Sequence, residues 1–339
     1  MAQAVIMAGG QGERFWPLAH KGFPKYRICF DGKRSLLRGT FDRLAKIYGK
    51  NGIHVVTTRE DEPMVREELP SLAKKAVFIE PFRNNTAAAM YLSTAIVEDR
   101  FGSEEPVSFF PADHLIRNEK LFGQTIHGAL RLAVERPVLV AIGVKPTFPA
   151  TGYGYIETGR SIPGHLSADH VKRFVEKPDL KKAAGYIRRK NFLWNGGIFT
   201  WRPSVFNAAM DKYSPDFKRN FNLKALASSY KRLPSTSIDY ALMEKADNIA
   251  VYRTKMDWCD MGSFDMLLER SPKDASKSLV RGKVISRENK NALILNHTAR
   301  PLVALGIADF IVVQTDQGTL LCPKGRAEEG ALLLRKLIP

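Results

Sequence analysis

The sequence predicts an α/β protein with a Rossmann-like, mostly parallel sheet and helices on both faces, followed by a small β-rich C-terminal domain. Two observations predict this class. Over most of the 339-residue chain, short continuous apolar runs alternate with amphipathic stretches of helical length. Such alternation is typical of a parallel sheet that is buried on both faces. From about Leu279 the pattern changes to short strand-like pieces separated by polar turns, which is typical of a β-rich unit.

The elements of the first part follow one another in regular order. Apolar runs predict strands at residues 5–7, 53–57, 76–79, 107–110 and 138–143. Between them, apolar residues at helical spacing predict helices at residues 35–48, 60–69, 86–100 and 119–134. Ligands of such sheets bind beyond the carboxyl ends of the strands. We therefore expect the segments that follow the first and fourth of these strands to carry functional residues.

The rest of the chain is predicted to contain a mixed middle region and the β-rich tail. Strands are expected at residues 153–157, 171–175, 198–201 and 250–252, and helices at residues 179–190 and 238–245. The tail has strand-like pieces at residues 280–285, 292–295, 302–305, 310–314 and 319–322, and a final helix at residues 327–337. A polar linker at residues 271–277 separates the two predicted domains, residues 1–270 and 278–339.

Composition argues against several classes of protein. The chain is 44% hydrophobic and 26% charged, as in ordinary globular proteins, and it has no apolar run near the ~20 residues of a membrane-spanning helix. No secretion leader is visible, and the three cysteines lack metal-binding spacing. The net charge of +17 would suit nucleic-acid binding, but the basic residues are scattered, which favours a surface that attracts small polyanions. We expect a cytoplasmic protein that binds neither membrane nor nucleic acid.

The most informative segment follows the first predicted strand. It combines three glycines with two cations, namely Gly9, Gly10, Gly12, Arg14 and Lys25. Glycine adopts positive φ at little cost and lets a phosphate approach backbone N–H groups, while the cations can neutralise its charge. The spacing fits neither a dinucleotide-binding G-x-G-x-x-G loop nor a Walker A loop. We interpret this segment as a phosphate-binding loop; the alternative is an ordinary glycine-rich turn.

A polar turn before the third predicted helix is a candidate base-binding edge. It contains Glu80, Asn85 and Thr86. Amide and hydroxyl groups beside a strand end can read a purine, and the Glu80 carboxylate can accept hydrogen bonds from guanine N1–H and its exocyclic amine. The alternative is structural, because Asn85 or Thr86 can simply cap the helix.

Two aspartates are candidate ligands of a Mg²⁺ ion. Asp113 follows the apolar strand at residues 107–110, and Asp260 lies between an aromatic residue and a glycine. Mg²⁺ prefers one or two carboxylates together with phosphate oxygens and waters. His114 fits a supporting role better, since Mg²⁺ favours oxygen ligands. The alternative for Asp113 is a turn aspartate.

A third group of residues suits a sugar phosphate. Gly154 lies between two tyrosines, and Glu176 and Lys177 stand together at a strand end before Pro178. A carboxylate there can hold sugar hydroxyls while the ammonium holds the phosphate. Asn195 offers both a donor and an acceptor to a hydroxyl. The alternative for Glu176 and Lys177 is a surface ion pair.

In this order along one chain, the motifs resemble those of the sugar-1-phosphate nucleotidyltransferases, and within that family the guanylyltransferases that act on mannose 1-phosphate. The resemblance covers essentially the whole chain and rests on AGGQGERFWPL, EPFRNNTAAA, PADH, TGYGYIE, FVEKP, FLWNGGIFTW, SIDYALMEK and WCDMGSF. It implies transfer of GMP from GTP to mannose 1-phosphate, without the isomerase activity of longer relatives. Another sugar 1-phosphate or nucleotide, and a catalytically silent sensor of sugar nucleotides, remain as alternatives.

The resemblance also implies a role for each candidate residue. The triphosphate would be bound by Gly9, Gly10, Gly12 and Arg14, and the guanine site would be bordered by Glu80, Asn85 and Thr86. The Mg²⁺ ion would be bound by Asp113 and Asp260, with Lys25 on the phosphate under attack. The sugar would contact Gly154, Glu176 and Asn195, and its phosphate Lys177. We count Arg14, Lys25, Asp113, Lys177 and Asp260 as catalytic, and expect that the tail allows a homodimer.

Overall fold

A nine-stranded sheet forms the centre of one of the two units into which the chain packs. The structure, a computed structural model, describes residues 2–10, 12–30, 32 and 34–337. Of these described residues, those in the ranges 2–9, 40–112 and 116–258 form unit 1, and those in the ranges 10–39, 113–115 and 259–337 form unit 2. Most of the glycine loop therefore belongs to the same unit as the tail. The predicted linear domains, residues 1–270 and 278–339, stay a prediction.

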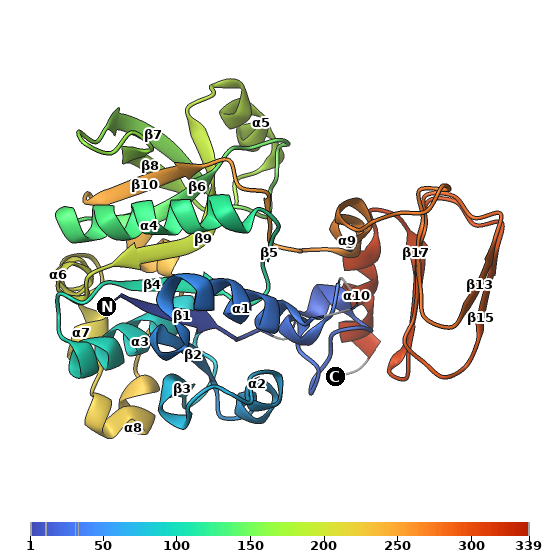
Figure 1. The fold of residues 1–339 in the computed structure, drawn as a ribbon, viewed down its shortest axis with the longest axis horizontal. Coiled ribbons are helices and arrows are strands. Elements are labelled where there is room, and N and C mark those ends of the chain that lie inside the picture. The colour runs from blue at the N-terminus through green and yellow to red at the C-terminus, as the bar shows by residue number, and fades with distance from the viewer. Residues whose placement is uncertain (1, 11, 31, 33, 338–339) are drawn as a thin grey trace. The chain divides into compact units, whose positions relative to one another are not determined.

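The sheet of unit 1 is the mostly parallel, Rossmann-like core that the sequence predicts (Figure 1). Its strand order is β3-β2-β1-β4-β9-β6-β10-β8-β7. The strands are β1 (Gln3–Met7), β2 (Ile53–Thr58), β3 (Val77–Glu80), β4 (Val107–Pro111), β6 (Leu139–Val144), β7 (Tyr155–Ser161), β8 (Ala168–Val175), β9 (Phe192–Trp201) and β10 (Ile249–Thr254). Parallel pairs join β1 to β2 and β4, β2 to β3, and β6 to β10. Only β8 and β9 run opposite to the other strands of this sheet.

The helices of unit 1 include several that the periodicity did not identify. The predicted ones are α1 (Leu36–Tyr48), α2 (Glu62–Glu68), α3 (Asn85–Phe101), α4 (Glu119–Glu135) and α5 (Leu180–Arg188), and the additional ones are α6 (Pro203–Tyr213), α7 (Asp216–Asn220) and α8 (Leu226–Tyr230). The helix expected at residues 238–245 is instead a π-helical turn, Asp239–Met243. Its Glu244 N–H bonds to the Asp239 carbonyl, five residues back, rather than four as in an α-helix.

Helices cover both faces of this sheet. Neighbouring residues of β4 point to opposite faces, because side chains alternate along a strand. The Phe110 ring contacts Phe122 of α4. The Phe109 ring instead packs on Trp201, which stacks on Phe206 of α6 with ring centroids 4.6 Å apart. Therefore α4 covers one face and α6 the other, as the predicted fold class requires.

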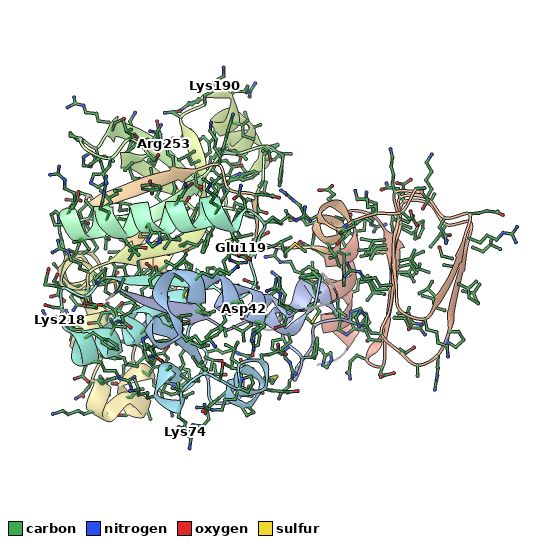
Figure 2. All side chains as sticks on the ribbon, viewed as in Figure 1. Asp42, Lys74, Glu119, Lys190, Lys218 and Arg253 are labelled. Atoms are coloured by element: carbon green, nitrogen blue, oxygen red, sulfur yellow. The ribbon has the colours of Figure 1, made fainter. Side chains whose placement is uncertain are left out.

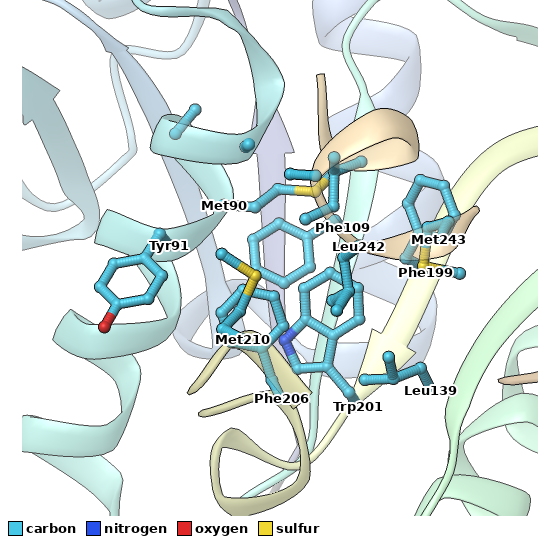
Figure 3. Packing of buried hydrophobic residues seen from close by; sticks show 14 of the residues in the cluster. Met90, Tyr91, Phe109, Leu139, Phe199, Trp201, Phe206, Met210, Leu242 and Met243 are labelled. Atoms are coloured by element: carbon cyan, nitrogen blue, oxygen red, sulfur yellow. The ribbon is translucent and has the colours of Figure 1, made fainter. Parts of the chain in front are cut away.

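The core on the α6 side also anchors the π-helical turn. Figure 3 shows Leu242 beside the rings of Phe109 and Trp201, and Met243 beside that of Phe199. Both Leu242 and Met243 are at most 1% exposed. Burying two such side chains contributes roughly 1.5–3 kcal/mol each, so the turn that carries them is held firmly against the sheet.

Unit 2 combines the glycine loop, a short helix and a β-rich tail. Short 3₁₀ turns at Glu13–Phe15 and Lys25–Arg27 follow the loop, and α9 (Phe264–Arg270) precedes the tail. The Phe15 ring lies 4.8 Å from that of Phe264 and 5.5 Å from that of Phe30. These rings share one core with apolar residues of the tail, among them Leu293 and Ile311.

The tail winds between two small sheets and ends in a helix (Figure 1). One sheet is β12 (Leu279–Arg281), β14 (Leu293–Asn296), β16 (Phe310–Thr315) and β17 (Gly318–Pro323), the other is β13 (Val284–Arg287) with β15 (Leu302–Leu305), and α10 (Ala327–Leu337) follows. The single strand expected at residues 280–285 is wrong. Gly282 splits it, because its φ is +87° and a Cβ there would lie 1.9 Å from the Asn296 carbonyl oxygen.

The basic side chains of unit 1 are dispersed, as their spacing in the sequence predicts. Lys74, Lys190, Lys218 and Arg253 lie on separate parts of its surface (Figure 2). Several are paired with acids, such as Lys218 with Asp211. In the part of the chain that the structure describes, no helix has both the length and the apolar character to cross a membrane.

Candidate active site

The glycine loop borders a cavity of about 530 Å³ in unit 2. Five of the predicted site residues line it: Gly12, Arg14, Lys25, Asp113 and Asp260. His114, for which we expected a supporting role, also lines it, as do three residues without a predicted role, Glu13, Phe15 and Gly262. Residues from three separate stretches of sequence therefore meet here. The cavity brings together two cations and three carboxylates, two of them the predicted metal ligands, which is the chemistry expected for a phosphate site that also takes a divalent ion.

Lys25 is firmly held in this cavity. Its Nζ donates to Oδ2 of Asp113 at 2.7 Å and to the main-chain oxygen of Asp260 at 2.8 Å. The Lys25 side chain is 12% exposed, and its Nζ lies 5.6 Å from the centre of the Phe15 ring. These contacts fix the ammonium between the two predicted metal-binding aspartates.

The electrostatics of the cavity favour a charged Asp113. Burial alone would raise the pKa of this carboxyl, but the Lys25 ammonium and then His114 act in the opposite direction, so the pKa of Asp113 lies below its usual range. An oppositely charged group within hydrogen-bonding distance favours the ionised form. Asp113 is thus an anion over the ordinary pH range and can ligate a cation.

Gly12 is required by the packing of the loop. Its φ is +68°, and a Cβ at this position would lie 2.3 Å from the Cβ of Lys25. Gly10 also has a positive φ, +93°, but a Cβ on Gly9 or Gly10 would meet open space. The backbone of Gly9 and Gly10 is thus accessible, as close approach by a phosphate demands.

Arg14 is more loosely held than Lys25. Its side chain is 55% exposed, and its guanidinium lies 3.4 Å from Glu328 of α10. A pair between two exposed side chains is worth little, typically about 0.2–1 kcal/mol. Arg14 is therefore able to turn toward an anion in the cavity at small cost.

A second group of predicted residues meets in unit 1. Gly154, Glu176 and Asn195 come from three different segments but lie together, since a Cβ on Gly154 would be 2.5 Å from Oε2 of Glu176 and 3.2 Å from the Cβ of Asn195. The Asn195 N–H donates to the Gly154 carbonyl at 2.8 Å. Any side chain at position 154 would therefore fill the space beside the Glu176 carboxylate.

Lys177 also belongs to this second group, and its backbone has an unusual conformation. Its φ is +43°, a conformation uncommon for residues with a side chain. The Lys177 Nζ lies 3.3 Å from Oε1 of Glu176. The Glu176 side chain is 10% exposed and that of Lys177 is 55% exposed, and burial raises the pKa of Glu176 against the lowering effect of Lys177.

Two acids that the sequence analysis did not single out belong to this group. Oδ1 of Asp239 accepts from Asn195 Nδ2 at 3.0 Å, and Oε1 of Glu244 accepts from the Glu176 N–H at 2.8 Å. Both lie in the SIDYALMEK segment. The motif was quoted for the resemblance, but nothing in its local pattern shows which distant residues its acids contact.

Glu80 of the predicted base-binding edge is buried and bonded within unit 1. Glu80 is only 6% exposed, and the Tyr230 hydroxyl donates to its carboxylate. Burial raises the pKa of Glu80 to about 7, despite the opposing effects of Tyr230 and then Arg83. At least one oxygen of Glu80 is therefore already used within unit 1, and a guanine-binding role for it stays a prediction.

Asn85 and Thr86 contact the protein itself at the start of α3. The Asn85 side chain accepts from the Thr86 N–H at 2.8 Å, and Asn85 has a φ of +65°. The Thr86 hydroxyl accepts from the Ile238 N–H at 2.9 Å. This second bond ties the turn to the segment that carries Asp239.

Comparisons with known proteins identify the family of this chain. The family model described as nucleotidyl transferase matches residues 3–277. A mannose-1-phosphate guanylyltransferase of Sinorhizobium fredii is 34% identical over 96% of this chain and 65% of its own length, and one of Salmonella montevideo is 32% identical over 99% of this chain and 74% of its own length. The chain thus spans slightly less than two thirds of the length of the first of these relatives.

One solved structure is similar to this fold over the full length of the chain. A protein of Thermus thermophilus, described as a mannose-1-phosphate geranyltransferase, is 29% identical with a TM-score of 0.88, and the match covers 100% of this chain and 99% of that one. Such likeness over the full length extends to the β-rich tail. The fold, the glycine loop and the family match lead to one conclusion: this chain belongs to the nucleotidyl transferase family.

Proposed function

We propose that this protein transfers GMP from GTP to mannose 1-phosphate, giving GDP-mannose and pyrophosphate. The observation that carries the proposal is the cavity beside the glycine loop, where Arg14 and Lys25 meet Asp113 and Asp260. Cations beside exposed backbone suit a triphosphate. The names of the Sinorhizobium and Salmonella relatives support mannose 1-phosphate as the acceptor and guanylyl as the group transferred.

The reaction requires the protein to position the two substrates and to neutralise the charge of their phosphate groups. An oxygen of the sugar phosphate attacks the α-phosphorus of GTP in line, the bond to the bridging oxygen breaks, and pyrophosphate leaves. A phosphate monoester is already an anionic nucleophile, so no side chain need remove a proton from it. In this proposal Lys25 neutralises the phosphate under attack and Arg14 the departing pyrophosphate.

The residues of the cavity fit a Mg²⁺ ion. Asp113 and Asp260 offer carboxylate oxygens in one cavity, and the Lys25 ammonium already lies between the Asp113 carboxylate and the Asp260 main chain, a position that therefore accommodates positive charge. When bound by these two aspartates, the ion would offset the charge of the phosphate groups. Gly154, Glu176 and Asn195 would hold the sugar, and Lys177 its phosphate.

The test is pyrophosphate release by the purified chain with Mg²⁺, with GTP, ATP, UTP and dTTP each crossed with mannose, glucose and heptose 1-phosphates. We expect by far the highest kcat/KM with GTP and mannose 1-phosphate. A clear preference for another pair would move the substrate assignment and keep the site. No release with any pair, from a folded protein, would overturn the enzyme and favour a sensor of sugar nucleotides.

A further inference from the structure

The π-helical turn Asp239–Met243 presents two acids in an arrangement that an α-helix cannot give. Five residues of α-helix turn the chain by about 500°, which would leave Asp239 and Glu244 about 140° apart around the axis. The bond from the Glu244 N–H to the Asp239 carbonyl, 2.9 Å long, widens the turn and brings Glu244 closer to the side of Asp239 than an α-helix would. Such π-turns are rare and often occur at functional sites.

This turn is fixed from two sides. On its core side, Leu242 and Met243 are buried among the aromatic rings shown in Figure 3. On its N-terminal side, the Ile238 N–H donates to the Thr86 hydroxyl at 2.9 Å, and the Thr236 carbonyl accepts from the Ala87 N–H at 3.2 Å. The backbone of Asp239 therefore has little freedom to move.

From this fixed turn, Asp239 orients the side chain of Asn195. The Asp239 carboxylate takes one N–H of the Asn195 amide at 3.0 Å. The amide oxygen of Asn195 accepts from the Gly197 N–H, also at 3.0 Å. Both ends of the amide are thereby oriented, and its second N–H has a defined direction.

Glu244 holds the neighbouring turn in the same way. Its Oε1 accepts from the backbone N–H of Glu176 at 2.8 Å. The next residue, Lys177, has the strained φ of +43°, and such a backbone persists only where its surroundings hold it. The two acids of the π-turn thus contact the two segments that carry Asn195 and the Glu176–Lys177 pair.

We propose that Asp239 is a positioning residue of the sugar-phosphate site, which acts by fixing the Asn195 amide toward a sugar hydroxyl, with Glu244 fixing the Glu176–Lys177 turn beside it. This inference rests on the proposed function, because it takes these residues to bind the sugar phosphate. A buried carboxyl is costly unless its hydrogen bonds compensate. Partial burial, together with the nearby Glu176 carboxylate, raises the pKa of Asp239 above its usual range, in keeping with a group that serves the site rather than the stability of the fold.

The test is a double-mutant cycle between Asp239 and Asn195, read as KM for each substrate separately. We expect Asp239→Ala to raise KM for mannose 1-phosphate about ten- to hundredfold and to change KM for GTP less than about twofold. Asp239→Asn should restore most of this loss, because its amide oxygen can still accept from Asn195. The Asp239→Ala/Asn195→Ala pair should be little worse than Asn195→Ala alone, since Asp239 acts through Asn195.

The control is Asp247→Ala. Asp247 is an exposed acid that follows the π-helical turn and pairs with Lys212, so its loss should leave both KM values unchanged. Thermal unfolding of each variant verifies that it is folded. Asp239→Leu, which has a similar size but no acceptor oxygen for Asn195, takes the place of Asp239→Ala in the cycle if that variant does not fold. Additive losses in the cycle, equal effects on both KM values, or no rescue by Asp239→Asn would each overturn the inference. A wild-type chain that does not turn over mannose 1-phosphate would instead overturn the proposed function.

Discussion

Glu80 provides a quantitative test of how its buried carboxyl affects stability. Its pKa is raised from 4.5 to about 7 in the folded chain, chiefly by burial. A carboxyl with a higher pKa in the folded than in the unfolded chain binds more protons when folded, so stability falls as pH rises between these values. Each unit of difference between the pKa in the folded chain and that in the unfolded chain corresponds to about 1.4 kcal/mol. The ionised group therefore costs about 3 kcal/mol above pH 7, and most of that cost, about 2–3 kcal/mol, appears between pH 5 and pH 8.

The Glu80→Gln variant removes this cost and keeps an oxygen for the Tyr230 hydroxyl. We expect its free energy of unfolding to be close to that of the wild type at pH 5 and about 2–3 kcal/mol higher than the wild type at pH 8. Urea unfolding of both proteins at the two pH values measures the difference, and Glu60→Gln, at an exposed position of the same unit, controls for loss of a surface charge. A stability difference that does not change with pH, or a wild type that is the more stable at pH 8, would refute the reasoning.

The same variant separates the two interpretations of Glu80. If its carboxylate reads guanine, Glu80→Gln raises KM for GTP, because one acceptor becomes a donor. If the residue only supports unit 1 through Tyr230, KM for GTP is unchanged while the pH dependence of stability is lost. The two measurements are independent, so each interpretation has its own result.

Three further predictions concern the cavity beside the glycine loop and the sugar-phosphate group of unit 1. Gly12→Ala should lower the free energy of unfolding by about 1–3 kcal/mol more than Gly22→Ala, as measured by thermal or urea unfolding. Both positions need a positive φ, but a Cβ at Gly12 would strike Lys25 whereas one at Gly22 would meet open space. Equal losses in the two variants would contradict this. Lys177→Ala should raise KM for mannose 1-phosphate at least about tenfold with KM for GTP nearly unchanged, and a parallel rise in both would argue against a phosphate contact. Asp113→Ala should reduce kcat/KM more than Asn195→Ala, because it disturbs both metal and phosphates; comparable losses would count against the assigned roles.

The sheet and the glycine loop could be predicted because their signals are local. Apolar runs define β1 to β4 without knowledge of their neighbours, and the glycines at positions 10 and 12 do adopt positive φ. The predicted strand at residues 280–285 failed for a non-local reason. The chain turns at Gly282 to pass the Asn296 carbonyl, a contact that no pattern within the strand reveals.

In the candidate site, too, residues in local motifs could be predicted, whereas contacts between distant residues could not. Lys25, Asp113 and Asp260 could be named from motifs, but their hydrogen bonds join residues up to 235 positions apart. Asp239 was missed because its partner Asn195 lies 44 residues away and because helical periodicity does not distinguish a π-turn from an α-helix. Glu80 looks alike in sequence whether it faces a ligand or Tyr230, 150 residues distant.

The most direct test of the proposed function is ³¹P NMR of the wild-type chain with Mg²⁺, GTP and mannose 1-phosphate. The proposal predicts that GDP-mannose and pyrophosphate appear in equal amounts as both substrates disappear, without release of inorganic phosphate. Attack at the α-phosphorus yields these two products together. Spectra that show only hydrolysis of GTP, or no change with a folded protein, would contradict it.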